Sequence, residues 1–165
     1  MKTIRVILVS DNHGQEEPLQ DVRAAYPHAD FYLHCGDSEM PRQMLDGFAC
    51  VRGNNDYYDE YPMMLTLDIG THRFLMVHGH RNLWFMDPTP LAALARQQHC
   101  DVVCFGHTHV YYDETVDGIR LLNPGSIWRN RDGSIPSFMD ITISDGRIHV
   151  QRMNYRIGAD PCIWK

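Results

Sequence analysis

Histidine and aspartate recur in this sequence directly after short apolar runs. His107 and His109 follow the run from Val102 to Phe105, with one residue between them. The imidazole side chain is a common ligand for zinc, manganese, iron and nickel. An extended backbone would point both rings the same way, whereas a turn would aim them at two neighbouring ions. The ordinary alternative is that both are surface loop histidines without a metal. The rest of the sequence distinguishes these two interpretations.

Four further groups of polar residues have the same placement. They are Asp11-Asn12-His13, Gly36-Asp37, Gly53-Asn54-Asn55-Asp56 and His78-Gly79-His80, each at the end of an apolar run. A helix cap or a turn would explain any one of them. Turn chemistry does not explain why they recur, and carboxylates brought together at strand ends repel unless a proton or a metal ion separates them. The pattern therefore favours a metal site.

The apolar runs predict the strands that would position these side chains. Residues 4–9, 31–35 and 48–51 are expected to be strands, with a helix over about 18–26 and a short helix around 41–45. Strand-helix-strand units of this length have parallel strands and a right-handed crossover. Asp11 and Asp37 should then lie at the same edge of one sheet.

The second half of the chain predicts mainly hairpins. Residues 63–69 and 72–77 flank Gly70-Thr71, while Asp117-Gly118 and Asp145-Gly146 separate 110–116 from 119–123 and 137–143 from 147–155. Asp-Gly between apolar runs is the strongest short hairpin signal. A helix over about 88–98 precedes the strand 102–105. This order predicts an α/β fold in four layers (αββα), with two mixed β-sheets packed face to face and flanked by helices.

Composition restricts the functional classes. A chain of 165 residues is expected to form a single domain, residues 1–165. The net charge of −6, without a cluster of lysine or arginine, argues against a nucleic-acid-binding surface. No apolar run reaches membrane-spanning length, no signal peptide is evident, and five cysteines have no framework spacing. We therefore expect a cytoplasmic protein with reduced thiols that acts on a small molecule. The protein could form a homo-oligomer.

These motifs resemble the five ordered motifs of the calcineurin-like metallophosphoesterase superfamily. The matching residues are Asp11-x-His13, Gly36-Asp37, Gly53-Asn54, His78 and Gly106-His107-x-His109. The small size, the His-Gly-His form of the fourth motif and the loop Asn123-Pro124-Gly125-Ser126 resemble its small YfcE-like phosphodiesterase branch. The resemblance covers about residues 4–126, and Asn123 and Ser126 are expected to shape their loop rather than bind substrate.

The resemblance implies a binuclear metal centre. Asp37 would bridge two divalent ions, Mn²⁺ or else Zn²⁺, Fe or Ni²⁺. Its companions would be Asp11, His13 and His109 at the first ion and Asn54, His78 and His107 at the second. The implied reaction is in-line attack of a metal-bridging hydroxide on a small phosphoester, here a phosphodiester. Asp11 and Asp37 would thus be catalytic residues as well as ligands.

One position departs from the pattern of the superfamily. Many members have, in place of Asn55, a histidine that is thought to protonate the leaving group, whereas the YfcE-like branch commonly has cysteine. An amide cannot act as a general acid, and losing one typically costs a factor of about 10²–10⁴ in rate. His80 could replace it, or could be a loop residue. Arg52 and Arg81, with Asn54, are candidate substrate contacts, although surface arginines often have no such role.

Two alternative functions remain open from the sequence. The same site could serve a phosphomonoesterase or a nucleotide pyrophosphatase, because nothing in the sequence separates monoester from diester substrates. The chain could instead be a Vps29-like non-catalytic scaffold. All seven expected ligands are present, which argues against a scaffold with an impaired metal site. An interaction patch would be sought at Trp84, Phe85 and Met86, although such a run often packs beneath its motif.

Overall fold

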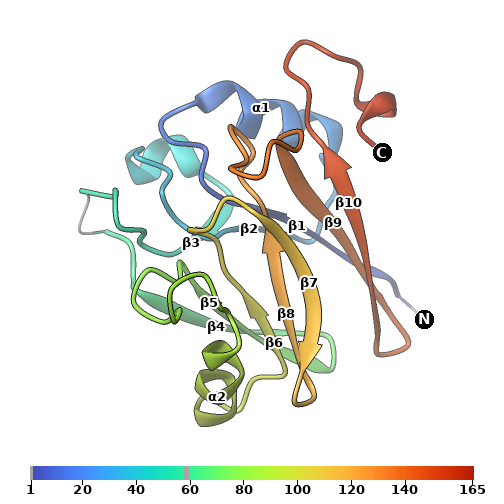
Figure 1. Cartoon of the computed structure of the whole chain (residues 1–165). Helices are drawn as coiled ribbons and strands as arrows, with labels where there is room; N and C mark the ends of the chain where they lie inside the picture. Colours follow the sequence, from blue (N-terminus) through green and yellow to red (C-terminus); the bar gives the residue numbers. More distant parts are fainter. Residues whose placement is uncertain (1, 58–59) are drawn as a thin grey trace.

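Two five-stranded β-sheets pack face to face in the computed structural model of the chain (Figure 1). Structure is described for residues 2–57 and 60–165. The strands are β1 (Ile4–Val9), β2 (Phe31–His34), β3 (Phe48–Cys50), β4 (Met64–Ile69), β5 (His72–Val77), β6 (Val102–Cys104), β7 (Tyr111–Val116), β8 (Ile119–Pro124), β9 (Ser137–Ser144) and β10 (Arg147–Asn154). The helices are α1 (Glu16–Ala25), α2 (Pro90–Gln97) and the short 3-10 helices η1 (Arg42–Leu45) and η2 (Pro161–Ile163).

The first sheet has the strand order β10-β9-β1-β2-β3. Its strands β1, β2 and β3 are parallel, as the βαβ pattern predicted, while β9 and β10 are antiparallel neighbours. Residues 6–9 of β1 are fully buried, as expected for a strand covered on both faces. Val9 pairs with His34, and His34 pairs with Cys50. The carboxyl ends of the three strands therefore lie side by side.

The second sheet has the order β4-β5-β6-β8-β7, with β5, β6 and β8 parallel and the outer strands antiparallel. All three predicted hairpins are present. Asp117 and Gly118 have φ of 51° and 81°, the left-handed conformation that a two-residue hairpin turn requires at both positions. The short helix expected around 41–45 is a 3-10 turn, and α1 begins earlier than expected, at Glu16.

Helices cover the outer faces of both sheets, so the predicted four-layer sandwich is confirmed. A buried apolar cluster fills the space between the sheets, where Val6 and Leu8 of β1 pack with Phe74 and Met76 of β5. A second cluster joins α1 to the first sheet, and a third joins α2 to the second sheet. The C-terminal Trp164 is also buried in the second cluster. No helix in the described residues is long and apolar enough to cross a membrane.

Candidate metal centre

The loops after β1, β2, β3, β5 and β6 converge on one edge of the sandwich. Backbone hydrogen bonds join them: Asp11 N donates to Gly36 O at 3.1 Å, and Gly106 N donates to His78 O at 2.9 Å. The Ser126 hydroxyl, after β8, donates to Asp11 O at 2.7 Å. Segments from both sheets are thus fixed against one another. The convergence of strand ends from two sheets brings together residues that are distant in the sequence.

Five of the seven expected ligands have left-handed backbone conformations. The positive φ angles lie between 45° and 70° and belong to Asp11, His13, Asp37, His107 and His109. Such angles are uncommon in residues other than glycine, although Asp and His tolerate them better than most. Strained conformations of this kind persist where the surrounding structure enforces them and cluster at functional sites. Each of these residues leaves its strand through a sharp turn that redirects its side chain.

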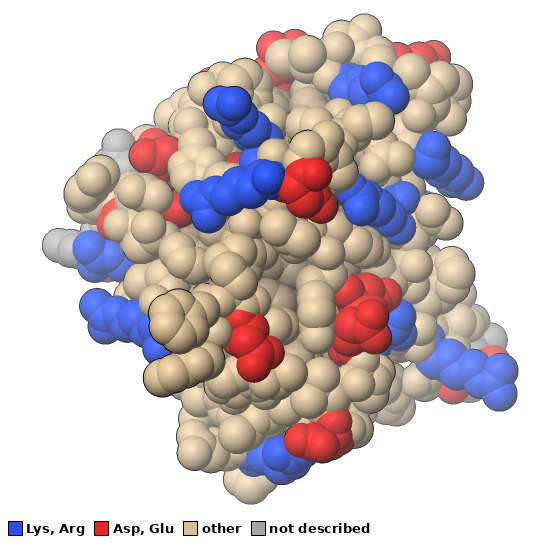
Figure 2. Space-filling model, in the orientation of Figure 1, with Lys and Arg blue, Asp and Glu red and all other residues tan. Residues whose placement is uncertain are grey.

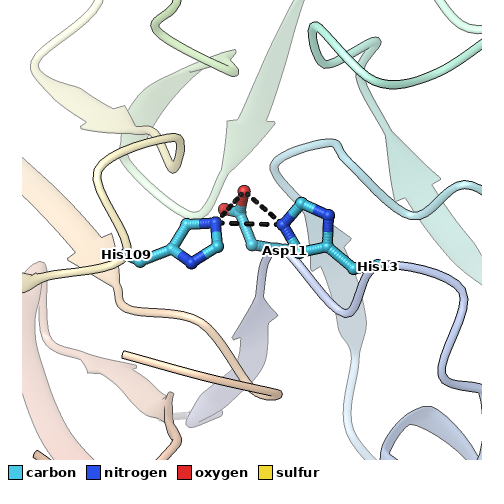
Figure 3. Close-up of side chains that lie close together, drawn as sticks. All are labelled: Asp11, His13 and His109. Atoms are coloured by element: carbon cyan, nitrogen blue, oxygen red, sulfur yellow. Dashed lines mark hydrogen bonds and ion pairs between the residues drawn. The ribbon is translucent and has the colours of Figure 1, made fainter. Parts of the chain in front are cut away.

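A first cluster consists of Asp11, His13 and His109 (Figure 3). Asp11 Oδ1 lies 3.2 Å from His109 Nε2 and 3.7 Å from His13 Nε2. The two Nε2 atoms are 3.0 Å apart. Both rings point their Nε2 atoms toward the carboxylate between them (Figure 3). One carboxylate oxygen and two imidazole nitrogens therefore face a common point, as the ligands of a bound divalent ion would.

The two oxygens of Asp11 have different surroundings. Asp11 Oδ2 accepts hydrogen bonds from the Ser10 hydroxyl at 2.5 Å and from His107 N at 3.1 Å. Asp11 Oδ1 is buried and accepts no hydrogen bond from any residue described. A buried carboxylate oxygen without a donor is costly. A metal ion between Oδ1 and the imidazoles would remove that cost, so the donor set fits a divalent cation.

A second cluster adjoins the first. His78 Nε2 lies 3.4 Å from Asp37 Oδ2 and 3.9 Å from Asp11 Oδ1. Asn54 Oδ1 is 2.9 Å from His78 Nε2 and 3.1 Å from His107 Nδ1. His107 and His109 thus face different clusters, as expected if a turn rather than an extended backbone follows β6. The groups with mutually close ligand atoms are Asp11 with His13 and His109, and Asp11 with Asp37 and His78.

Outer hydrogen bonds fix the orientation of the rings. His78 Nδ1 donates to Cys35 O at 2.7 Å, and His109 Nδ1 donates to Arg129 O at 2.9 Å. Because a carbonyl can only accept, each Nδ1 must carry the proton, which leaves Nε2 available as a ligand in the neutral ring. His13 Nδ1 lies 2.9 Å from the Glu39 carboxylate. Such partners are typical of histidines that bind metal ions.

The carboxylates and imidazoles of the two clusters shift one another's pKa values. Burial raises the pKa of Asp11, but the charge of His78 and the adjacent imidazoles of His109 and His13 outweigh it and hold that pKa well below its ordinary value. Burial lowers the pKa of His78, but Asp11 and Asp37 outweigh it and raise that pKa to about 9. His78 therefore supplies positive charge to the buried carboxylates. A divalent cation would take over this role.

The remaining candidates surround the second cluster. Asn55 donates to both oxygens of Asp37, from its backbone N at 2.8 Å and from Nδ2 at 2.9 Å. The His80 ring centroid is 5.4 Å from that of His78, and His80 Nδ1 is buried without a hydrogen-bond partner among the described residues. Arg52 and Arg81 line a hollow together with His80. Arg52 Nε also donates to Asp56 O at 3.2 Å.

Asp56 and Glu39 were not singled out from the sequence. The buried Asp56 carboxylate accepts from the backbone N of Asp37 at 2.9 Å, of Glu39 at 2.8 Å and of Gly53 at 2.7 Å. It therefore locks the loops after β2 and β3 together. Its place at the end of Gly-Asn-Asn-Asp was the available signal. Glu39, two residues after Asp37, contacts a ring that only the fold brings near it.

Glycine is required where backbone and ligands pack closely. A Cβ at Gly53 would collide with Asp37, and one at Gly106 would collide with Ser10 and Asp11. Gly36 has φ of 100°, and a Cβ there would lie 2.9 Å from His78 Nδ1. These glycines let the backbone approach both carboxylates and the buried ring.

The chain matches one known protein family. Residues 4–146 match the model of the calcineurin-like phosphoesterase superfamily domain. The chain belongs to this superfamily. It is 34% identical over 147 residues to the probable metallophosphoesterase YsnB of Bacillus subtilis, covering 86% of each chain. It is also 28% identical over 138 residues to vacuolar protein sorting-associated protein 29 of Schizosaccharomyces pombe, covering 72% of this chain and 74% of that protein.

Solved structures of the superfamily share the fold. A predicted phosphoesterase of Streptococcus pneumoniae superimposes with a TM-score of 0.86 at 28% identity, covering 93% of this chain and 91% of that one. The phosphoesterase YfcE of E. coli superimposes with a TM-score of 0.63 at 19% identity, covering 93% of this chain and all of that one. The recognition of this superfamily from the sequence motifs is confirmed.

Proposed function

We propose that this metallophosphoesterase is a binuclear, metal-dependent phosphodiesterase. In this proposal Asp37 is shared by two divalent ions. Asp11, His13 and His109 hold the first ion, and Asn54, His78 and His107 hold the second. The observation that carries the proposal is the buried Asp11 Oδ1, which faces imidazole Nε2 atoms and accepts no hydrogen bond within the described part of the chain.

The donor set supports two ions that prefer nitrogen and oxygen together. Imidazole, carboxylate and amide ligands suit Mn²⁺, which we propose as the working metal, and also Zn²⁺, Fe and Ni²⁺, better than Mg²⁺. When bound, two such ions neutralise charge on the phosphoryl group and make water a stronger nucleophile. The chain itself then needs no serine or cysteine nucleophile. We further propose that residues 1–165 act as one domain in the cytoplasm, where the five cysteines, all unpaired here, stay reduced.

The hollow beside the second cluster is the proposed leaving-group side. It is lined by Arg52, Asn54, His80 and Arg81, among others. Guanidinium groups bind phosphoryl oxygens through directed hydrogen bonds. Both arginines line this hollow, and Arg81 is exposed whereas Arg52 is half-buried. We assign both to substrate contact.

Asn55 should make the rate strongly dependent on the leaving group. Asn55 holds Asp37 through two hydrogen bonds, but its amide is not acidic enough to transfer a proton. Without general acid catalysis, hydrolysis of alkyl esters should lose a factor of about 10²–10⁴, whereas nitrophenyl esters, whose leaving group needs no proton, should lose little. Steady-state rates over a series of aryl and alkyl methylphosphonates or diesters measure this dependence. Asn55→His should raise turnover of the poor leaving groups selectively.

A flat dependence in the wild type would contradict this assignment and direct attention to His80. The matched variants Asn55→Ala and His80→Gln separate the two positions. If Asn55 only orients Asp37, Asn55→Ala should lower metal occupancy and slow all leaving groups alike. A proton delivered by His80 would instead make His80→Gln steepen the dependence.

A metal-supplemented screen tests the proposed function itself. We expect Mn²⁺-dependent hydrolysis of bis-p-nitrophenyl phosphate at a higher kcat/KM than that of p-nitrophenyl phosphate. A higher value for the monoester would favour the phosphomonoesterase alternative, and hydrolysis of nucleoside diphosphate esters alone would favour a pyrophosphatase. No hydrolysis above a heat-treated control would favour a scaffold. The similarity to vacuolar protein sorting-associated protein 29 keeps that last outcome relevant, and Trp84, Phe85 and Met86 are indeed exposed.

A further inference from the structure

A second hollow lies against the first cluster, whereas the hollow that contains His80 lies beside the second. Among the residues that the structure describes, it shares no lining residue with the hollow that contains His80. Its walls are His13 and His109 of the first cluster and the loop between β8 and β9. That loop contributes Trp128, Arg129 and Arg131 to the walls. The sequence motifs did not point to any of these three residues.

Internal hydrogen bonds hold this loop in place. The Ser126 hydroxyl accepts from Trp128 N at 3.1 Å and from Arg129 N at 2.8 Å. Arg131 N donates to His109 O at 3.0 Å. Asn130 is buried, and its Oδ1 accepts from Ser126 N at 2.7 Å. The loop backbone is therefore fixed relative to His109, and its side chains stand at set positions beside the metal centre.

The arginines of the loop keep donors for a ligand. Within the described chain, the Arg129 guanidinium makes no hydrogen bond or ion pair, and Arg131 donates to His107 O at 3.2 Å without pairing to an acid. The nearby acid Asp132 is engaged by the Ser134 hydroxyl at 2.6 Å. Several basic side chains, with an acidic one among them, lie over the β8–β9 loop (Figure 2), although the chain carries a net charge of −6. This local positive charge suits an anion.

Trp128 adds an apolar surface to the same hollow. Its side chain is 42% exposed, although large aromatic side chains are usually mostly buried. An exposed indole beside guanidinium groups can stack on a flat ring while the guanidinium groups bind a phosphate. A nucleoside with a phosphate of its own has both features. Inorganic anions would use the arginines alone.

We propose that this hollow binds the retained half of the substrate, a nucleoside that carries a second phosphate besides the scissile one. The proposal rests on the proposed function, because it takes the hollow with Asn55 and His80 as the leaving-group side. The nucleobase stacks on Trp128, and the second phosphate pairs with Arg129 and Arg131. The substrate class is then a phosphorylated nucleotide diester, as in a short oligonucleotide fragment, rather than a simple diester.

Three chromogenic esters with one leaving group test this assignment. They are bis-p-nitrophenyl phosphate, thymidine 5′-(p-nitrophenyl phosphate), and the latter with an added 3′-phosphate. In each, the oxygen of water forms a new P–O bond, the P–O bond to p-nitrophenolate breaks, and a proton is released to solvent, so the phosphate stays on the retained group. For the Mn²⁺-loaded wild type, kcat/KM should rise at each step of this series, by about tenfold for the added phosphate.

Variants identify the residues responsible. Arg129→Gln should lower kcat/KM for the bisphosphorylated ester about tenfold more than for thymidine 5′-(p-nitrophenyl phosphate). Trp128→Ala should act on both thymidine esters more than on bis-p-nitrophenyl phosphate. The control Arg147→Gln replaces an exposed arginine at the start of β10, outside both hollows, and should change none of the rates. Equal losses for all three esters, or none, would overturn the proposal.

A binding measurement separates this proposal from the proposed function. Calorimetry of the Mn²⁺-loaded protein with thymidine 3′,5′-bisphosphate should give a Kd about tenfold weaker in Arg129→Gln than in Arg147→Gln. That difference without any ester hydrolysis would mean that the proposed function is wrong while the nucleotide site stands. Hydrolysis of bis-p-nitrophenyl phosphate together with identical bisphosphate binding by both variants would mean that the nucleotide site is wrong while the proposed function stands.

Discussion

Replacement of Asp11 by alanine should abolish Mn²⁺-dependent diester hydrolysis while the protein remains folded. Asp11 is the residue common to both clusters of closely spaced ligand atoms. Losing it removes the charged oxygen that faces His13, His78 and His109. We expect kcat/KM for bis-p-nitrophenyl phosphate to fall by about 10³-fold or more, since stabilisation by a metal ion contributes several kcal/mol and each 1.36 kcal/mol is tenfold.

The fold of this variant should persist for two reasons. Removing Asp11 relieves its repulsion with Asp37. The site also lies at the edge of the sandwich, where water can reach the groups that Asp11 contacted. Circular dichroism and thermal unfolding check the fold. Asp11→Asn keeps the side-chain volume and should be equally inactive. The control Asp68→Ala removes an exposed carboxylate of β4 and should retain wild-type activity. Substantial activity in a folded Asp11→Ala would refute the ligand assignment.

Removing the metal ions should lower Tm by about 5–10 °C relative to the Mn²⁺-saturated protein. A ligand at 100 times its Kd stabilises the folded state by about 2.7 kcal/mol, and 1 kcal/mol corresponds to about 2–4 °C for a chain of this size. Without the ions, Asp11 Oδ1 stays buried with no hydrogen-bond donor in the described chain, and only neighbouring imidazoles such as His78 balance the charge of the two carboxylates. Differential scanning calorimetry with and without a chelator measures the shift.

Metal analysis of the same samples tests how the ligands are shared. The wild type should bind two Mn²⁺ per chain. Asp37→Ala should bind none, because both ions lose a ligand, whereas His109→Ala should mainly lose the first ion. Asp68→Ala again serves as the control. One ion per chain in the wild type would contradict the binuclear centre, and equal occupancy in Asp37→Ala and His109→Ala would contradict a bridging role for Asp37.

The sequence by itself determined the layers and most of the strands. Short apolar runs predicted β1, β2 and β3, and the Asp-Gly turns predicted the hairpins β7–β8 and β9–β10 with their two-residue loops. These are local signals, because the turn geometry and the burial of a strand depend on neighbouring residues. Helix ends were less accurate: α1 begins at Glu16, where Gln15 provides no side-chain cap to mark the boundary.

The candidate ligands were also visible in the sequence, since Asp11, Asp37 and His109 each follow a strand. What the sequence left open was the direction of each side chain. His107 and His109 face different clusters because both have left-handed backbones after β6, a choice that is stabilised by contacts with Asn54, Asp11 and the carbonyl of Arg129. Those partners lie on other loops, so local sequence could not specify the outcome.

Only the tertiary structure showed what Glu39, Asp56, Trp128 and Arg129 contact. Asp56 ends the group Gly53-Asn54-Asn55-Asp56, whereas the other three resemble ordinary loop residues in the sequence. The surroundings of all four depend on contacts between loops that follow different strands. Asp56 locks two loops through backbone amides, and Arg129 presents its carbonyl to His109 and its side chain to the adjoining hollow. Such roles depend on distances between chain segments far apart in sequence, which are set by the packing of two sheets rather than by any local pattern.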